Sequence, residues 1–134
     1  MTITVLQPAG WAAPKGYANG VAATGLQVFV AGQIGWNAQC AFDSDDLVAQ
    51  VRQALANVKA VLAEAGAQPQ HITRMTWYLV DKREYLARAR EIGSVYREVL
   101  DREYGVAMTA VQVAGLIEDR AQVEIEVTAV RPLA

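Results

Sequence analysis

Two glutamates near the end of the chain are the clearest candidates for a catalytic role. Glu124 and Glu126 alternate with apolar residues in the run from Val123 to Val130, which predicts a β-strand with both carboxylates on one face. A carboxylate held on a rigid strand can accept a proton from water. It can equally form a structural salt bridge or bond to backbone, and Glu126 suits that role better. The pattern alone leaves both roles open for Glu124.

Other reactive residue types are scarce. His71 is the only histidine, and the surrounding Gln-Pro-Gln-His stretch is typical of a surface loop. Cys40 is the only cysteine, so it excludes an internal disulfide, and no basic neighbour favours its reactive thiolate form. No cluster of His, Cys and carboxylates has the spacing of metal ligands, so no metal site is expected.

Three further residues have side chains or backbone suited to ligand contact. Tyr17 could stack on a ligand or donate a hydrogen bond from its hydroxyl, or its ring could simply fill space within a loop. Gly32 could expose backbone groups to a ligand, or it could permit a bend after a strand. Trp36, in a Gly-Trp-Asn loop, suits either a planar ligand or a subunit interface.

Charge and composition restrict the class of protein. The chain has 134 residues, 53% of them hydrophobic and 19% charged, which predicts one globular domain spanning 1–134. Twelve basic and fourteen acidic residues give a net charge of −2. The densest basic stretch, Lys82 to Arg90, is interrupted by Glu84 and indicates a solvated helix face. The sequence therefore argues against nucleic-acid binding.

The N-terminus and the apolar stretches bear on the compartment. Met1 to Tyr17 lacks a basic segment followed by an apolar one, so no signal peptide is predicted. The apolar stretches are too short to cross a membrane. Together with the single cysteine, these features predict a cytoplasmic protein with no membrane contact.

Hydrophobic periodicity predicts the elements that position the candidate residues. A short strand Ile3 to Leu6 is followed by a hairpin from Gly20 to Ala31 that turns at Ala23-Thr24-Gly25. The first helix is capped by Asp43 or Ser44, carries an apolar stripe from Leu47, and ends at Gly66. A strand from Ile72 to Val80, a helix from about Arg83 to Leu100, and strands near Ala107 to Ala114 and Gln122 to Val130 complete the chain.

This β-β-β-α-β-α-β-β order predicts an α+β fold, with a mixed sheet and two helices on one face. Val123, Ile125 and Val127 would face the helices. The opposite face would carry Glu124 and Glu126. Such a mixed face either meets water or packs against another subunit.

Several segments resemble a known family. Gly32-Gln33-Ile34 resembles a Ser-Gly-Gln-Ile segment, and Val51 to Gly66 is similar to a first-helix signature in which Gln53 and Asn57 have counterparts. The run Val123 to Val130 resembles the closing strand. On these residues the chain resembles the YjgF/Rid (reactive intermediate deaminase) family from about Tyr17 to Val130.

The resemblance implies a chorismate-mutase-like fold that forms a homotrimer, with a central barrel of sheets and ligand clefts between subunits. It also implies a deaminase, a hydrolase that converts enamines and imines to carbonyl compounds and ammonia without a cofactor. In the family, an arginine of the penultimate strand binds the substrate carboxylate, and a glutamate of the last strand positions the attacking water.

Transferred by position, the resemblance assigns that catalytic role to Glu124. Substrate contacts fall to Tyr17, Ala31 (where the family has serine), Gly32, Met108 and Ala110, with Trp36 near by. Met108 stands where the family arginine is expected, in Val106-Ala107-Met108.

Methionine offers a soft apolar wall and no charge, so a free 2-iminocarboxylate would lose its anchor. Arg120 and Arg74 are the candidate replacements. The sequence thus leaves two main functions open: a deaminase for a bulkier or carboxylate-masked substrate, and a non-catalytic trimer that binds a small molecule. A third function, RNA cleavage, has less support because the sequence has no basic stripe and no pair of histidines.

Overall fold

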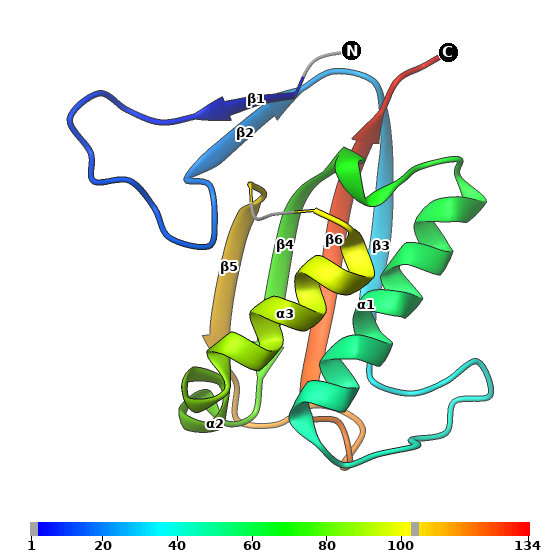
Figure 1. Cartoon of the computed structure of the whole chain (residues 1–134). Helices are drawn as coiled ribbons and strands as arrows, with labels where there is room; N and C mark the ends of the chain where they lie inside the picture. Colours follow the sequence, from blue (N-terminus) through cyan, green and yellow to red (C-terminus); the bar gives the residue numbers. More distant parts are fainter. Residues whose placement is uncertain (1–2, 103–104) are drawn as a thin grey trace.

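The computed structural model describes residues 3–102 and 105–134, and its strands and helices follow the predicted order (Figure 1). In chain order they are β1 (Ile3–Leu6), β2 (Gly20–Ala23), β3 (Leu26–Ile34), α1 (Leu47–Glu64), the short 3-10 helix η1 (Pro69–His71), β4 (Ile72–Leu79), α2 (Lys82–Ala87), α3 (Ala89–Leu100), β5 (Ala107–Gln112) and β6 (Val123–Arg131). None of the helices in these described ranges has the length and apolarity needed to cross a lipid bilayer.

A mixed four-stranded sheet forms the centre, in the order β3-β6-β4-β5. β6 is antiparallel to both of its neighbours, and β5 runs parallel to β4. Helices α1 and α3 cover one face, as Figure 1 shows. Val123, Ile125 and Val127 are buried beneath them, and so are Met75 and Trp77 of β4. The predicted α+β fold with helices on one face is confirmed.

The first helix ends as predicted but begins later. Its N-cap is Asp46, whose carboxylate accepts a hydrogen bond from the backbone N–H of Ala49 at 3.1 Å, and neither Asp43 nor Ser44 caps it. Ser44 instead accepts a bond from the backbone N–H of Asp46 at 3.0 Å. Gly66 has φ +68°, the left-handed conformation that terminates a helix at its C′ position.

The predicted hairpin between Gly20 and Ala31 is wrong. The chain does bend at Gly25, which has φ 147°. However, β2 pairs with β1 in a separate two-stranded sheet, whereas β3 pairs with β6. The physical reason is burial: Val30 and Ile34 of β3 are buried in the central sheet, whereas none of the residues of β2 is buried.

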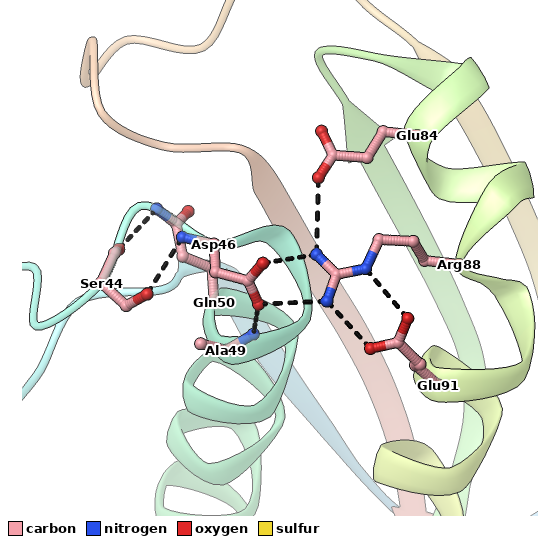
Figure 2. Close-up of polar contacts among 7 residues, drawn as sticks. All are labelled: Ser44, Asp46, Ala49, Gln50, Glu84, Arg88 and Glu91. Carbon is pink, nitrogen blue, oxygen red and sulfur yellow. Dashed lines mark hydrogen bonds and ion pairs between the residues drawn. The ribbon is translucent and has the colours of Figure 1, made fainter.

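The second predicted helix is two helices, broken at Arg88. Figure 2 shows that at this break the Arg88 guanidinium turns toward the N-terminus of α1 and forms ion pairs with Asp46, Glu84 and Glu91. The bond to Glu91 measures 2.9 Å. These partners raise the pKa of Arg88, and Arg88 lowers the pKa of both Asp46 and Glu91. The cluster fixes α2 and α3 against α1.

Candidate functional site

Five of the candidate residues divide between two pockets on opposite faces of the sheet. Met108 and Ala110 of β5 lie opposite Met75 and Trp77 of β4, so their side chains share the helix-covered face. Glu124 of β6 lies on the other face. Each pocket therefore holds only part of the predicted site.

The helix-side pocket is a cavity of about 400 Å³ between α2, α3 and β5. It is lined by Lys15, Gly16, Tyr17, Tyr85, Ala89, Ile92, Met108 and Ala110. Tyr17 reaches it because the N-terminal loop docks beside β5: the backbone N–H of Ala18 donates to the carbonyl of Val106 at 2.8 Å. Tyr17, Met108 and Ala110, three of the residues expected to contact the substrate, thus line one pocket.

The chemistry of the helix-side pocket is mainly apolar. Lys15 supplies the one charged side chain among the described residues that line it. Met108 offers a polarisable wall, and Tyr85 and Tyr17 add aromatic surface. This lining suits the apolar or aromatic part of a small molecule better than a bare carboxylate.

The open-face pocket is a second cavity, of about 270 Å³, at the end of β3 and the start of β6. It is lined by Gly32, Tyr78, Val113, Gly115, Leu116, Ile117, Glu124 and Glu126. Gly32 and Glu124, both predicted site residues, meet here. Glu124 is half-buried, and no hydrogen bond or ion pair joins its carboxylate to another residue of the described ranges.

A β-bulge in β3 brings Gly32 and Glu124 into contact. Val30 pairs with Val127 and Gln33 with Ile125, so Ala31 and Gly32 together oppose the single residue Glu126. A Cβ atom on Gly32 would lie 2.2 Å from Oε2 of Glu124. The carboxylate therefore occupies the space that any side chain at position 32 would need.

Tyr78 is a site residue that the sequence did not reveal. It is the cross-strand partner of Glu124, yet its hydroxyl donates a 2.5 Å hydrogen bond to Glu126. That bond, together with the nearby carboxylate charges, raises the pKa of Tyr78. The alternation of Met75, Trp77 and Leu79 with more polar residues indicates that Tyr78 lies on the other face of its strand, but its contact with Glu126 depends on the register between β4 and β6.

Side-chain amides of α1 hold the strand that carries Gly32. Asn57 donates to the carbonyls of Ile34 at 3.1 Å and Trp36 at 2.8 Å, and it accepts a bond from Gln53 at 2.8 Å. The buried Gln50 donates to the carbonyl of Arg120 at 2.9 Å, close to the start of β6. The two strands that meet at the open-face pocket are thus anchored to one helix.

The remaining candidates lie elsewhere. Trp36 contacts Phe42, with ring centroids 6.0 Å apart, and lines neither pocket. Arg120 pairs with Asp45 at 2.8 Å and lies over the Phe42 ring, away from the described lining of both pockets. Ala31 lines another cavity, of about 440 Å³, together with Arg74.

Arg74 is closer than Arg120 to the predicted substrate contacts. It lines a further cavity, of about 420 Å³, together with Tyr17 and Met108. Of the two arginines considered as replacements for the missing one, the structure thus brings Arg74 beside cleft residues. Among the described residues, no three His, Cys, Asp or Glu side chains gather as a metal site would require.

Comparisons with known proteins agree with the fold. The family model described as Endoribonuclease L-PSP matches residues 9–131. A RutC family protein of Synechocystis is 33% identical over 135 residues, covering 98% of this chain and 99% of its own. A 2-iminobutanoate/2-iminopropanoate deaminase of Salmonella typhimurium is 30% identical over 109 residues, covering 80% of this chain and 81% of its own.

A solved structure is similar over almost the whole length. The Rid-family protein YyfB of Yersinia pestis superposes with a TM-score of 0.85 at 30% identity. The match covers 98% of this chain and 100% of that protein. Both the sheet and the helices therefore have counterparts in a solved structure.

Proposed function

Because this chain belongs to the YjgF/Rid family, we propose that it hydrolyses an enamine or imine to a carbonyl compound and ammonia. The observation that carries the proposal is the carboxylate of Glu124, which lies in the open-face pocket against Gly32. A carboxylate without a hydrogen-bond partner among the described residues is available to accept a proton from water.

The proposed reaction needs one base and a bound substrate. An enamine first becomes an imine as its N–H proton moves to the β-carbon. The water oxygen then bonds to the C=N carbon while Glu124 takes a proton from that water and passes it to the nitrogen. The resulting carbinolamine loses its hydroxyl proton by the same route. The C–N bond then breaks, the carbonyl forms, and ammonia leaves. Imines hydrolyse readily, so positioning and one general base suffice.

A complete cleft requires a neighbouring subunit. Within one protomer, Met108 and Glu124 lie on opposite faces of the sheet, so Met108 cannot form an apolar wall for the Glu124 carboxylate there. The family is typically homotrimeric. We therefore place the substrate between subunits, with the helix-side pocket of one protomer facing the open-face pocket of the next.

The substrate class follows from the helix-side pocket. Its lining by Met108, Tyr17, Tyr85 and Ile92 favours an apolar or aromatic substituent. The Salmonella relative is named for 2-iminobutanoate and 2-iminopropanoate, small substrates that carry a carboxylate. With methionine at position 108, the preferred substrate is bulkier and depends less on a free carboxylate.

The direct test is ammonia release from freshly generated imines and enamines, with and without a free carboxylate. Wild type should exceed the spontaneous rate on bulky or carboxylate-masked compounds, and Glu124→Gln should not. Glu64→Gln, an exposed glutamate at the end of α1, is the matched control and should behave as wild type. Equal rates for wild type and Glu124→Gln would contradict the proposal.

A non-catalytic trimer that binds a small molecule is the second candidate, favoured by Met108 in place of an arginine. In that case Glu124→Gln would leave ligand affinity unchanged, and no compound would be turned over. RNA cleavage has less support. The single histidine, His71, lies in η1 and accepts a 3.0 Å bond from the backbone N–H of Gln68, outside both pockets.

A further inference from the structure

Two carboxylates face the same side of β6, but their surroundings differ. Glu126 accepts the 2.5 Å bond from Tyr78, whereas Glu124 lies against Gly32. Residues two apart on a strand point to the same face, so the two carboxylates are close enough to repel each other. The surroundings of the two carboxylates therefore determine which of them contacts the substrate.

Tyr78 can determine this through its hydrogen bond to one of the two carboxylates. Its backbone lies opposite Glu124 in the β4–β6 register, but its side chain extends along the face and donates to Glu126. A charge-assisted hydrogen bond disperses the negative charge of its acceptor. It also fixes the carboxylate of Glu126, which leaves the space above Gly32 to Glu124.

The other groups around this pair do not compete for the hydroxyl. The charged groups that act on Tyr78 are Glu126 and Glu124 of β6 and Arg74 of its own strand. The loop after β5 contributes Val113, Leu116 and Ile117 to the pocket wall, and none of these carries a charge. Among the charged groups that act on Tyr78, Glu126 has the largest effect.

We infer that Tyr78 is a positioning residue that, by binding Glu126, leaves Glu124 as the carboxylate that acts on water. This inference rests on the proposed deaminase function and extends it to the division of roles between the two glutamates. Tyr78 acts through Glu126 and has no contact with the reacting atoms in this account.

The experiment compares kcat, KM and their pH dependence in wild type, Tyr78→Phe and the double variant Tyr78→Phe/Glu126→Gln. Tyr78→Phe removes one oxygen and leaves the ring. We expect kcat to fall on the order of tenfold, the effect of losing one charge-assisted hydrogen bond, with KM little changed.

The pH profile separates positioning from a structural role. Without the hydroxyl, the Glu126 carboxylate is no longer held in place, so it can approach Glu124, and its negative charge then disfavours the charged form of Glu124. The acid limb of the kcat profile should therefore move to higher pH in Tyr78→Phe. Removing the charge in the double variant should return the limb toward its wild-type position. A limb that stays fixed in both variants would overturn the inference and leave the deaminase proposal intact.

A second measurement is independent of activity. The phenol of Tyr78 is titrated by NMR of labelled tyrosine, with Tyr78→Phe used to assign its signal. In wild type its pKa should be raised, and Glu126→Gln should lower it toward the ordinary range, because the accepting carboxylate is gone. An unchanged titration would overturn the inference even in an active enzyme. If no imine is turned over, the proposed function and the positioning role both fall, whereas the titration still shows whether the pair exists.

Discussion

The carboxylate of Glu124 occupies the space in which a side chain on Gly32 would lie. The distance from Oε2 of Glu124 to an ideal Cβ at position 32 is 2.2 Å, far inside van der Waals contact. The bulge at Ala31 and Gly32 in β3 creates this approach. The glycine is therefore required for the position of the proposed base rather than for the backbone conformation of the strand.

Gly32→Ala should lower activity and leave folding nearly intact. The added methyl group must displace the Glu124 side chain, whose end is flexible, so we expect kcat to fall by at least about tenfold. The thermal midpoint should change little. Kinetics and thermal unfolding on the same preparation provide the measurement.

Gly115→Ala is the matched control for that substitution. Gly115 lines the same pocket, but a Cβ added there would have no described atom within 4 Å. Its activity should stay close to wild type. If both variants lose activity equally, or if Gly32→Ala remains fully active, the contact between Gly32 and Glu124 does not position the base.

Met108→Arg should change substrate preference. A guanidinium in the helix-side pocket would supply the bidentate partner that a 2-iminocarboxylate needs, worth about 1.5–3 kcal/mol. The ratio of kcat/KM for 2-iminopropionate to that for a bulky uncharged imine should rise roughly tenfold to a hundredfold. Met108→Leu, which keeps the apolar volume, should retain the wild-type preference. Vigorous wild-type turnover of 2-iminopropionate would show that methionine does not set this preference.

Arg88→Met should make the free energy of unfolding less dependent on pH in the acid range. Arg88 lowers the pKa of Asp46 and Glu91 in the folded protein, so each carboxylate contributes stability above its ordinary pKa and loses it as pH falls through the lowered value. The difference in unfolding free energy between wild type and Arg88→Met should be largest at neutral pH and shrink below about pH 4.

Urea unfolding across that pH range measures this difference. Arg52→Met is the control, because it removes a more exposed ion pair between α1 and α3, Arg52–Glu98, and leaves the Arg88 cluster intact. Its effect on stability should be smaller than that of Arg88→Met. A difference for Arg88→Met that persists unchanged at low pH would show that the ion pairs contribute nothing.

Asn57→Leu should destabilise the end of β3. The variant removes both donors that satisfy the carbonyls of Ile34 and Trp36, and each unsatisfied carbonyl costs about 1–3 kcal/mol. The denaturation midpoint should fall clearly. Gln39→Ala, in the exposed loop that follows β3, should leave it unchanged. Equal midpoints for the two variants would show that the bonds from α1 do not stabilise the strand.

Periodic features of the sequence predicted much of this architecture. The alternation of Val123, Ile125 and Val127 with Glu124 and Glu126 gave the correct faces of β6, because side-chain direction in a strand follows from spacing alone. The apolar stripe of α1 and its ending at Gly66 were equally readable.

Features that depend on distant partners escaped prediction. The turn at Gly25 indicates a bend, but it cannot specify that β3 pairs with β6 and not with β2. Arg88, at the break between α2 and α3, binds Asp46, 42 residues away, and helical periodicity cannot reveal such a contact. The bond from Tyr78 to Glu126 likewise requires the register of two strands 48 residues apart.

The most direct test of the account is the rate of ammonia release from an aryl-substituted imine without a carboxylate, measured for wild type and Glu124→Gln at equal protein concentration. We expect wild type to exceed the spontaneous rate and Glu124→Gln not to exceed it, while the two proteins fold alike. Ammonia release at the spontaneous rate by wild type on every imine tested, or equal acceleration by Glu124→Gln, would contradict the assignment of Glu124 as the base of a deaminase.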